Sequence, residues 1–360
     1  MQDNYIYCIG LMSGTSLDGI DLAYIKIHEN SYKDFRIIQA DTIAYSNQWK
    51  NKLQEAINYD KKDLQILDVD YGKFLGKILN NFIKEHRITK LDFIASHGHT
   101  ILHQPEVGIT LQIGNGQEIA TITKKDVVCD FRTQDVVLGG QGAPLVPIGD
   151  RLLFSDYDYC LNLGGFANIS YEENKRRIAF DICPVNIVLN YYTRKIGVEY
   201  DNDGRMASEG KINVELLRRL NALSFYQELP PKSLGLEWVQ STIFPLIDKE
   251  EADISTILRT FVEHVAMQIG NVVKNDATIL VTGGGAFNTF LMKRIEFFAQ
   301  TKIKQVSTEL IDYKEALIFA LLGVLKVQNK VNCLQSVTGA KKDHSSGNIF
   351  YPHKKNKVLE

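Results

Sequence analysis

The chain has 360 residues, which is enough for two domains of ordinary size. Hydrophobic residues make up 44% of it and charged residues 23%, as is usual for folded proteins with a sizeable core. The formal net charge of −2 gives no electrostatic reason to expect nucleic acid or an anionic membrane as a partner. No run approaches the ~20 apolar residues of a membrane span. From charge and hydropathy together, we expect neither nucleic acid nor a membrane as a partner.

Five cysteines are spread widely along the chain, and they are Cys8, Cys129, Cys160, Cys183 and Cys333. No two of them have the CxxC spacing of a zinc or redox site, and an odd number does not suit a disulfide framework. Such cysteines fit a reducing compartment. The N-terminus lacks a basic segment followed by an apolar stretch, so we expect a cytoplasmic protein without disulfides and without a resident metal site.

The first part of the chain is predicted to open with three strands. A strand at Tyr5–Met12 leads into a polar turn, an alternating strand at Ile20–Ile27 and a third strand near Phe35–Tyr45. Two helices follow, then strands separated by a short helix. These later elements are helices at Trp49–Asn58 and Ile66–His86 and strands at Asp92–Ser96, Thr110–Ile113 and Val127–Phe131.

The second part repeats this layout. Strands at Tyr159–Leu163, Ala167–Tyr171 and Arg177–Asp181 are joined by tight turns, and the first of these turns contains Gly164 and Gly165. Helical periodicity then dominates, interrupted by one strand. The helices are predicted at Val185–Ile196, Ile212–Leu223, Glu237–Ile247, Ile254–Val273, Ala286–Ala299 and Tyr313–Val327, and the strand at Thr278–Val281.

This order predicts an α/β fold in which a mixed sheet with helices on its faces occurs twice. We expect an N-terminal domain at residues 1–135 and a C-terminal domain at residues 136–335. The C-terminal segment of about 336–360 is expected to pack back on the first domain. The stretch Gly139–Pro144 is dense in turn residues and is predicted to be either a hinge between the domains or a surface loop.

The turn between the first two strands is the first candidate site. Its residues are Ser13, Gly14, Thr15, Ser16, Leu17, Asp18 and Gly19. Backbone amides of such a turn can point at phosphate oxygens, and Asp18 could hold Mg²⁺ through water, because hard cations prefer oxygen ligands. The turn lacks the GxxxxGK[ST] pattern and is followed by a strand, so it is not a Walker A loop. A polar β-turn without function is the alternative.

A second glycine-rich turn, Gly283-Gly284-Gly285, lies between a predicted strand and a predicted helix. Such a junction suits a nucleotide, because the N-terminus of a helix favours phosphate. The GxGxxG spacing is absent, which argues against a dinucleotide-binding fold. A tight connection without a ligand is the alternative.

Asp181 is predicted to end an apolar strand, followed by Pro184 and a helix. A carboxylate in that position can have a raised pKa and act as a general base. The alternative is an aspartate that caps the helix.

His97 and His99 flank Gly98, with His103 nearby. No carboxylate or cysteine completes a metal set at familiar spacing, so we expect either a loop that contacts a substrate or structural histidines. Arg132 is expected at the end of a strand, where it could clamp a carboxylate or form a surface ion pair. Glu315 is expected to open the last long helix, where the helix dipole favours an acidic residue.

Together these motifs resemble the anhydro-N-acetylmuramic acid kinase family. The matching strings cover nearly the whole chain, to about Leu325, and the first and fifth of them are quite specific. They are GLMSGTSLDGID from Gly10, SHG from Ser96, LQIG from Leu111, DFR from Asp130, GGQGAPLVP from Gly139, LNLGGFAN from Leu161 and GGG from Gly283.

The resemblance implies two actin-like (ribonuclease H-like) lobes with a central cleft, a homodimer and a role in peptidoglycan recycling. The implied reaction uses ATP, with Mg²⁺, to phosphorylate O6 of 1,6-anhydro-N-acetylmuramic acid. Water opens the anhydro bridge in the same reaction, and the product is N-acetylmuramate 6-phosphate.

The resemblance also implies roles for single residues. Asp181 would take the proton from water. The amino-sugar substrate would be held by Ser13, His97, Arg132 and Glu315. The nucleotide would be bound by Gly14, Thr15, Ser16, Leu17, Asp18, Gly19, Ile20, Asp21, Gly164, Gly165, Gly283, Gly284 and Gly285.

Two places depart from the family pattern. The family usually reads Asp-Thr-Gly-Pro where this chain has Asp181-Ile182-Cys183-Pro184, and more often has glutamine where this chain has His99. Two other functions therefore stay open: a kinase of the same fold for another sugar, which opens no bridge, or a non-catalytic ATP-binding switch or filament protein.

Overall fold

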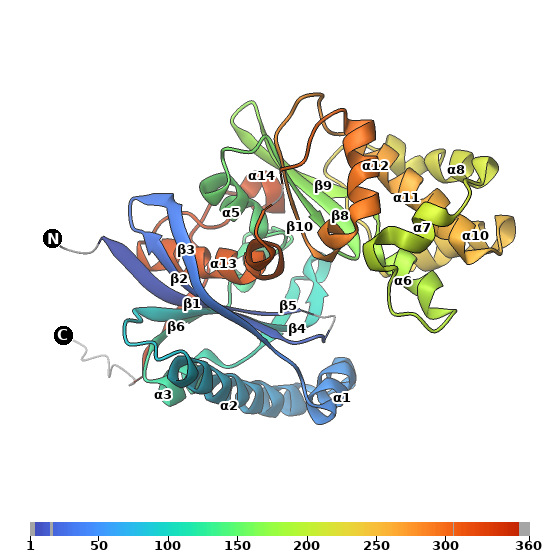
Figure 1. Cartoon of the computed structure of the whole chain (residues 1–360). Coiled ribbons are helices and arrows are strands. Elements are labelled where there is room, and N and C mark those ends of the chain that lie inside the picture. Colours follow the sequence, from blue (N-terminus) through green and yellow to red (C-terminus); the bar gives the residue numbers. More distant parts are fainter. Residues whose placement is uncertain (1–3, 15–16, 305, 353–360) are drawn as a thin grey trace. The chain divides into compact units, whose positions relative to one another are not determined.

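The structure is a computed structural model that describes residues 4–14, 17–304 and 306–352, so Thr15 and Ser16 of the predicted phosphate-binding turn lie outside the described residues. The chain forms two compact units (Figure 1). The first comprises Met1–Leu153 and Tyr313–Glu360, and the second comprises Phe154–Asp312. The division therefore falls after Leu153 and not after residue 135, and the stretch Gly139–Pro144 is a loop inside the first unit.

The first unit is built on a seven-stranded sheet with the order β11-β6-β4-β1-β2-β3, and β5 pairs with β4. Strands β1, β2 and β3 form an antiparallel meander, and β4 then pairs in parallel with β1. The strands are β1 (Tyr5–Ser13), β2 (Ile20–His28), β3 (Ser31–Ile43), β4 (Phe93–Gln104), β5 (Ile109–Ile113), β6 (Asp126–Cys129) and β11 (Asn348–Phe350).

The two faces of this sheet are covered by different helices because side chains alternate along β1. Ile9 and Leu11 lie in one core cluster with the apolar face of α2 (Lys61–Glu85). Gly10 faces α13 (Thr308–Val327), so closely that a Cβ on it would lie 1.9 Å from the Ala316 carbonyl oxygen. Figure 1 shows α2 and α13 on opposite sides of the strands.

The remaining helices of the first unit are short. They are α1 (Asn47–Glu55), α3 (Gly116–Thr123), α4 (Thr133–Val137), α5 (Val146–Leu153) and α14 (Gln335–Thr338). The helix α13 begins at Thr308, at the end of the second unit, and belongs to the first unit from Tyr313 onward.

The second unit is built on a four-stranded sheet with the order β10-β7-β8-β9. Its strands are β7 (Tyr159–Leu163), β8 (Phe166–Glu173), β9 (Arg176–Pro184) and β10 (Ile279–Thr282). Strands β7, β8 and β9 form an antiparallel meander, and β10 pairs in parallel with β7.

Helices bury one face of this sheet. Leu161, Ile169 and Phe180 of three neighbouring strands share a core with Phe261 and Val265 of α11. The helices of the unit are α6 (Asn186–Arg194), α7 (Arg205–Glu209), α8 (Val214–Asn221), α9 (Leu236–Trp238), α10 (Phe244–Glu250), α11 (Ile254–Gly270) and α12 (Thr289–Ala299).

Each unit therefore has a three-stranded meander and a fourth strand added in parallel to the first. This shared arrangement confirms the predicted actin-like (ribonuclease H-like) α/β fold, present twice. The predicted central cleft stays a prediction. Of the helices that the structure describes, none has both the length and the apolar character needed to cross a membrane.

Candidate active site

The turn that follows β1 is anchored in the core of the first unit by the side chain of Leu17. The backbone N–H of Leu17 donates to the Gly14 carbonyl at 3.3 Å, and the Leu17 side chain is buried in the core at a φ of 59°. Asp18, the next residue, is exposed, so its carboxylate is available to a ligand. Ile20 is fully buried and packs in the core. Asp21 accepts a hydrogen bond from the Thr42 hydroxyl at 2.6 Å.

The Ser13 hydroxyl lies in a buried polar network of the first unit. Its Oγ lies 2.6 Å from the Tyr45 hydroxyl, accepts from the Tyr71 hydroxyl at 2.9 Å, and lies 3.0 Å from Nδ1 of His99. The side chains are nearly closed to solvent, and burial lowers the pKa of His99 to about 4. The hydroxyl of Ser13 is thus hydrogen-bonded within the protein, and its predicted contact with the sugar stays a prediction.

His97 and Arg132 form a fixed pair. Arg132 donates to Nε2 of His97 from Nε at 3.0 Å, and its NH2 nitrogen lies 2.9 Å from the same atom. Nδ1 of His97 faces the Gly98 carbonyl oxygen at 2.9 Å, so Nδ1 carries the hydrogen. Burial first, and the Arg132 charge second, hold the pKa of His97 well below its ordinary value. His97 is therefore a neutral acceptor that orients the guanidinium.

Two expectations about these positions were wrong. Ser96–His99 lies within the strand β4, which runs to Gln104, and not in a loop. Arg132 lies at the N-terminus of α4, because β6 ends at Cys129.

Glu315 lies near the same pair, although it is the eighth residue of α13 and does not open that helix. Phe319, one turn further along α13, packs on the ring of His97 with centroids 4.6 Å apart. Desolvation raises the pKa of the Glu315 carboxyl, and the charge of Arg132 opposes this shift. Three of the four predicted sugar-binding residues thus gather in one part of the first unit.

In the second unit, two glycine turns lie together because β7 and β10 are parallel neighbours. Gly164 and Gly165 follow β7, and Gly283–Gly285 follow β10. A Cβ on Gly283 would lie 2.6 Å from Oδ1 of Asn162, and one on Gly285 would lie 2.7 Å from Cβ of Leu163. Ligands of α/β sheets commonly bind beyond the carboxyl ends of the strands, where these turns lie.

The start of α6 closes the same region. The backbone N–H of Val185 donates to the Gly165 carbonyl at 2.8 Å, and that of Asn186 donates to the Gly164 carbonyl at 3.3 Å. The side-chain amide of Asn186 donates to the Leu163 carbonyl at 3.2 Å. The turn after β7 is therefore joined to the start of α6 by backbone hydrogen bonds, and the neighbouring turn after β10 packs on Leu163.

Asp181 belongs to a polar row that crosses all four strands of the second unit. Thr282, Asn162, Asn168 and Asp181 are successive partners on β10, β7, β8 and β9, and paired residues share a face of a sheet. Asp181 is the one member of this row that was predicted from the sequence to be functional. The other polar members could have been noticed because Asn162 and Asn168 interrupt otherwise apolar strands in the sequence.

A β-bulge shapes the strand around Asp181. Asp181 pairs with Asn168 and Cys183 pairs with Ala167, so Ile182 is the extra residue. Bulges bend a strand and redirect side chains, often beside active sites. Ile182 and Cys183 are both buried in the core, while Asp181 is part-exposed. Asp181 lies three residues before the end of β9 and does not cap the helix that follows.

The segment 230–235 holds the carboxylate of Asp181, and sequence reasoning missed it. The backbone N–H of Leu234 donates to Oδ2 of Asp181 at 2.8 Å, and the N–H of Asp181 donates to the Lys232 carbonyl at 3.1 Å. Desolvation raises the pKa of Asp181, and the Leu234 hydrogen bond opposes this shift. The sequence feature that could have indicated this segment is the Pro230-Pro231 pair, which lies outside any helical or strand periodicity.

The comparisons with known proteins identify the family. The model of the anhydro-N-acetylmuramic acid kinase family matches residues 6–352. The chain belongs to the anhydro-N-acetylmuramic acid kinase family.

Curated members of the anhydro-N-acetylmuramic acid kinase family match along their whole length. The kinase of Mannheimia succiniciproducens is 36% identical over 372 residues, covering 96% of this chain and 98% of that relative. The kinase of Bacillus cereus is 33% identical over 383 residues, covering 96% of this chain and all of that relative.

Solved structures of other families are similar at lower identity. Component A of the (R)-2-hydroxyglutaryl-CoA dehydratase of Acidaminococcus fermentans has a TM-score of 0.44 and 15% identity, over 90% of this chain and 99% of that one. A ROK family glucokinase of Streptomyces griseus, in complex with glucose and AMPPNP, has a TM-score of 0.40 and 10% identity, over 88% of this chain and 98% of that one. The assignment to the anhydro-N-acetylmuramic acid kinase family rests on the family model and the curated relatives.

The departures from the usual family pattern have a place in this structure. Ile182 and Cys183 fill the core of the second unit behind Asp181, where apolar side chains pack well. His99 takes part in the buried Ser13 network. These changes leave the carboxylate of Asp181 and its Leu234 hydrogen bond in place.

Proposed function

We propose that the chain is an ATP-dependent kinase that opens the 1,6-anhydro bridge of anhydro-N-acetylmuramic acid with water and phosphorylates O6. Its membership of the family over residues 6–352 supports the reaction class. The observation that carries the proposal is Asp181, a desolvated carboxylate held by a backbone N–H within a polar row beside the glycine turns.

Asp181 is the general base of the proposed mechanism. Its carboxylate removes a proton from water, and the resulting hydroxide forms a bond to the anomeric carbon. The bond from that carbon to the bridging oxygen breaks, and the oxygen leaves as O6. O6 then forms a bond to the γ-phosphorus of ATP as the bond to ADP breaks. The sum is ATP, anhydro sugar and water giving ADP, N-acetylmuramate 6-phosphate and the proton held by Asp181.

The nucleotide is bound by the glycine-bearing turns of the two units. Gly164, Gly165 and Gly283–Gly285 in the second unit carry no side chain that would stand between a phosphate group and the backbone of the turns. In the first unit the turn from Gly14 to Asp21 presents the exposed carboxylate of Asp18. An oxygen ligand of this kind fits Mg²⁺, which usually keeps several waters, and the ion would neutralise charge on the transferring phosphoryl group.

The sugar is held by His97, Arg132 and Glu315, with Ser13 supporting the adjacent strand end. Anhydro-N-acetylmuramic acid carries a carboxylate on its lactyl group, and a guanidinium oriented by a neutral histidine suits such an anion. The buried Ser13 network fixes the end of β1 from which the phosphate-binding turn starts. We also propose that the protein acts in the cytoplasm as a homodimer and takes part in peptidoglycan recycling.

The test is a comparison of acceptors. Purified full-length chain with ATP and Mg²⁺ should transfer phosphate to the anhydro sugar, detected by phosphorus NMR as a 6-phosphate of the open ring. Transfer only to ordinary hexoses or hexosamines would replace the proposal with a kinase for another sugar. Nucleotide-dependent assembly without any sugar phosphorylation would indicate a non-catalytic switch.

A further inference from the structure

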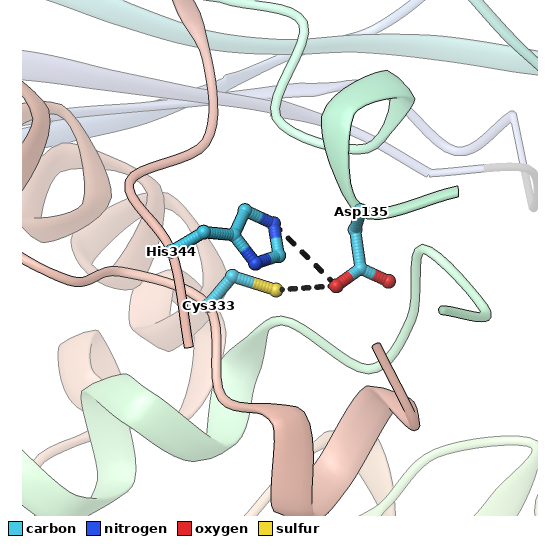
Figure 2. A group of neighbouring side chains, drawn as sticks. All are labelled: Asp135, Cys333 and His344. Carbon is cyan, nitrogen blue, oxygen red and sulfur yellow. Dashed lines mark hydrogen bonds and ion pairs between the residues drawn. The ribbon is translucent and has the colours of Figure 1, made fainter. Parts of the chain in front are cut away.

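The C-terminal part of the first unit brings three metal-ligating side chains into one buried cluster. Cys333 and His344 face each other in an isolated antiparallel bridge, and both lie against Asp135 of α4 (Figure 2). Their exposed fractions are 0% for Asp135, 1% for Cys333 and 5% for His344. The candidate ligand atoms all lie within 4.8 Å of one another.

The contacts converge on one oxygen of Asp135. Sγ of Cys333 donates to Oδ1 at 3.0 Å, the Thr338 hydroxyl donates to the same oxygen at 2.7 Å, and Nε2 of His344 lies 3.5 Å from it. Oδ2 accepts from the backbone N–H of Gly142 at 2.7 Å. The carboxylate is thus fixed from several sides.

His344 has a nitrogen without a hydrogen-bond partner aimed into this cluster. Its Nδ1 lies 3.1 Å from the Lys342 carbonyl oxygen, which can only accept, so Nδ1 carries a hydrogen. Nε2 is buried and makes no hydrogen bond, and Figure 2 shows the ring beside the Asp135 carboxylate and the Cys333 sulfur. In the neutral ring, this nitrogen presents its electron pair toward the carboxylate, so a cation between them would remove an unfavourable contact.

We propose that Asp135, Cys333 and His344 form a buried site for one Zn²⁺ ion. Thiolate sulfur, imidazole nitrogen and carboxylate oxygen are the ligand types that zinc takes in proteins, whereas Mg²⁺ and Ca²⁺ require oxygen ligands. A thiolate and a carboxylate balance the two positive charges of the ion, which favours its burial.

Binding at this site exchanges a proton for the metal. The thiol of Cys333 loses its proton as sulfur bonds to zinc, and Nε2 of His344 supplies its free electron pair. Affinity should therefore rise with pH. No familiar zinc spacing marks this cluster because Asp135 and Cys333 are 198 residues apart, and only the fold brings them together.

The proposed metal site is linked to Arg132 through the backbone of Gly142. Gly142 donates its N–H to Asp135 and accepts from Arg132 through its carbonyl at 2.6 Å. Gly140 approaches so closely that a Cβ on it would lie 2.2 Å from Oδ2 of Asp135. A metal that fixes Asp135 thereby fixes the loop that holds Arg132. This consequence for the sugar site rests on the proposed function, whereas the metal site does not.

The test begins with metal content. Full-length chain prepared with zinc in the medium and without a metal-binding tag should carry about one zinc per chain by mass spectrometry of the elements. Cys333→Ser and His344→Ala should each lose it. The matched control is Cys8→Ala, which replaces a buried cysteine of β1 outside the cluster and should keep the metal.

Replacing zinc with Co²⁺ tests directly whether the Cys333 thiolate is a metal ligand. After zinc removal, Co²⁺ added to the wild-type chain should give the near-ultraviolet absorption band of a cobalt thiolate, and Cys333→Ser should lack that band. Zinc removal should also lower the melting temperature of the wild-type chain and raise the KM of the sugar more than that of ATP. Zinc bound to an inactive kinase would contradict the proposed function and leave the metal site standing.

The proposal is overturned when the folded wild-type chain takes up neither Zn²⁺ nor Co²⁺ at neutral pH. The cluster would then be a set of buried side chains held together by the hydrogen bonds of Cys333 and Thr338 to Asp135. This outcome does not depend on whether the variants fold.

Discussion

Replacing Gly283 with alanine adds a single methyl group to the turn after β10. We expect this change to lower the free energy of unfolding and to weaken nucleotide binding, while sugar binding changes much less. Its φ of 81° and ψ of 163° lie in a region that only glycine adopts readily, at a cost of about 1–3 kcal/mol for other residues. A Cβ there would also lie 2.6 Å from Oδ1 of Asn162 and 2.9 Å from the carbonyl of Leu163. Since β7 must shift to relieve this overlap, Gly283→Ala should lose roughly 3 kcal/mol of the free energy of unfolding.

The matched control is Gly284→Ala in the same turn. A Cβ on Gly284 would meet nothing closer than 3.8 Å, and the backbone there needs no positive φ. Its free energy of unfolding should therefore stay within about 0.5 kcal/mol of the wild-type value. Urea unfolding can be followed through the two tryptophans, Trp49 in the first unit and Trp238 in the second.

Kinetics add a second readout to this pair. A displaced turn should raise the KM of ATP in Gly283→Ala, and misplacement of about 1 Å near reacting groups can cost on the order of 10²-fold in rate. The KM of the sugar should change much less. A Gly283→Ala variant as stable as Gly284→Ala, with an unchanged KM for ATP, would refute the close packing of the two turns.

Three further predictions concern residues near the reacting groups. Desolvation raises the pKa of Asp181 in the folded chain, so the ionised carboxylate lowers the free energy of unfolding. Asp181→Asn should therefore unfold at a higher urea concentration than the wild-type chain at neutral pH. This gain in stability should vanish below the ordinary carboxyl pKa, where Asp181 is protonated in both the folded and the unfolded chain. His97→Phe removes the acceptor of Arg132 and should raise the KM of the sugar at least tenfold, about 1.4 kcal/mol, with little change in the KM of ATP. Leu234→Pro removes the N–H that stabilises the ionised Asp181, so the acid limb of the pH–rate profile should move to higher pH, whereas an unmoved limb would exclude this role.

The repeated fold could be predicted because its signals are local. Alternating apolar residues and glycine-bearing turns marked the strands β1, β2, β7 and β8, and their observed bounds lie close to the predicted ones. The extent of β4 could not be read in this way. The polar stretch Ser96–His99 looks like a loop in sequence, yet it is a buried strand because partners distant in the chain satisfy its histidines.

The residues of the candidate site stay a prediction from the sequence, whereas their geometry comes only from the fold. Asp181 was identified from its place after an apolar stretch, whereas the bulge at Ile182 depends on pairing between strands. The Leu234 contact joins residues 53 positions apart, and no local pattern announces it. The return of the chain to the first unit at Tyr313 joins segments that the whole second unit separates in the sequence, and no local pattern indicates it.

The central claim is that Asp181 activates the water that opens the sugar, and isotope transfer tests it most directly. Wild-type chain, ATP and the anhydro sugar are incubated in ¹⁸O water, and the position of the label in the 6-phosphate product is read by mass spectrometry and carbon NMR. The account predicts label on the anomeric hydroxyl with unlabelled O6, and almost no turnover by Asp181→Asn under the same conditions. Product without label at the anomeric position, or full turnover by Asp181→Asn, would contradict it.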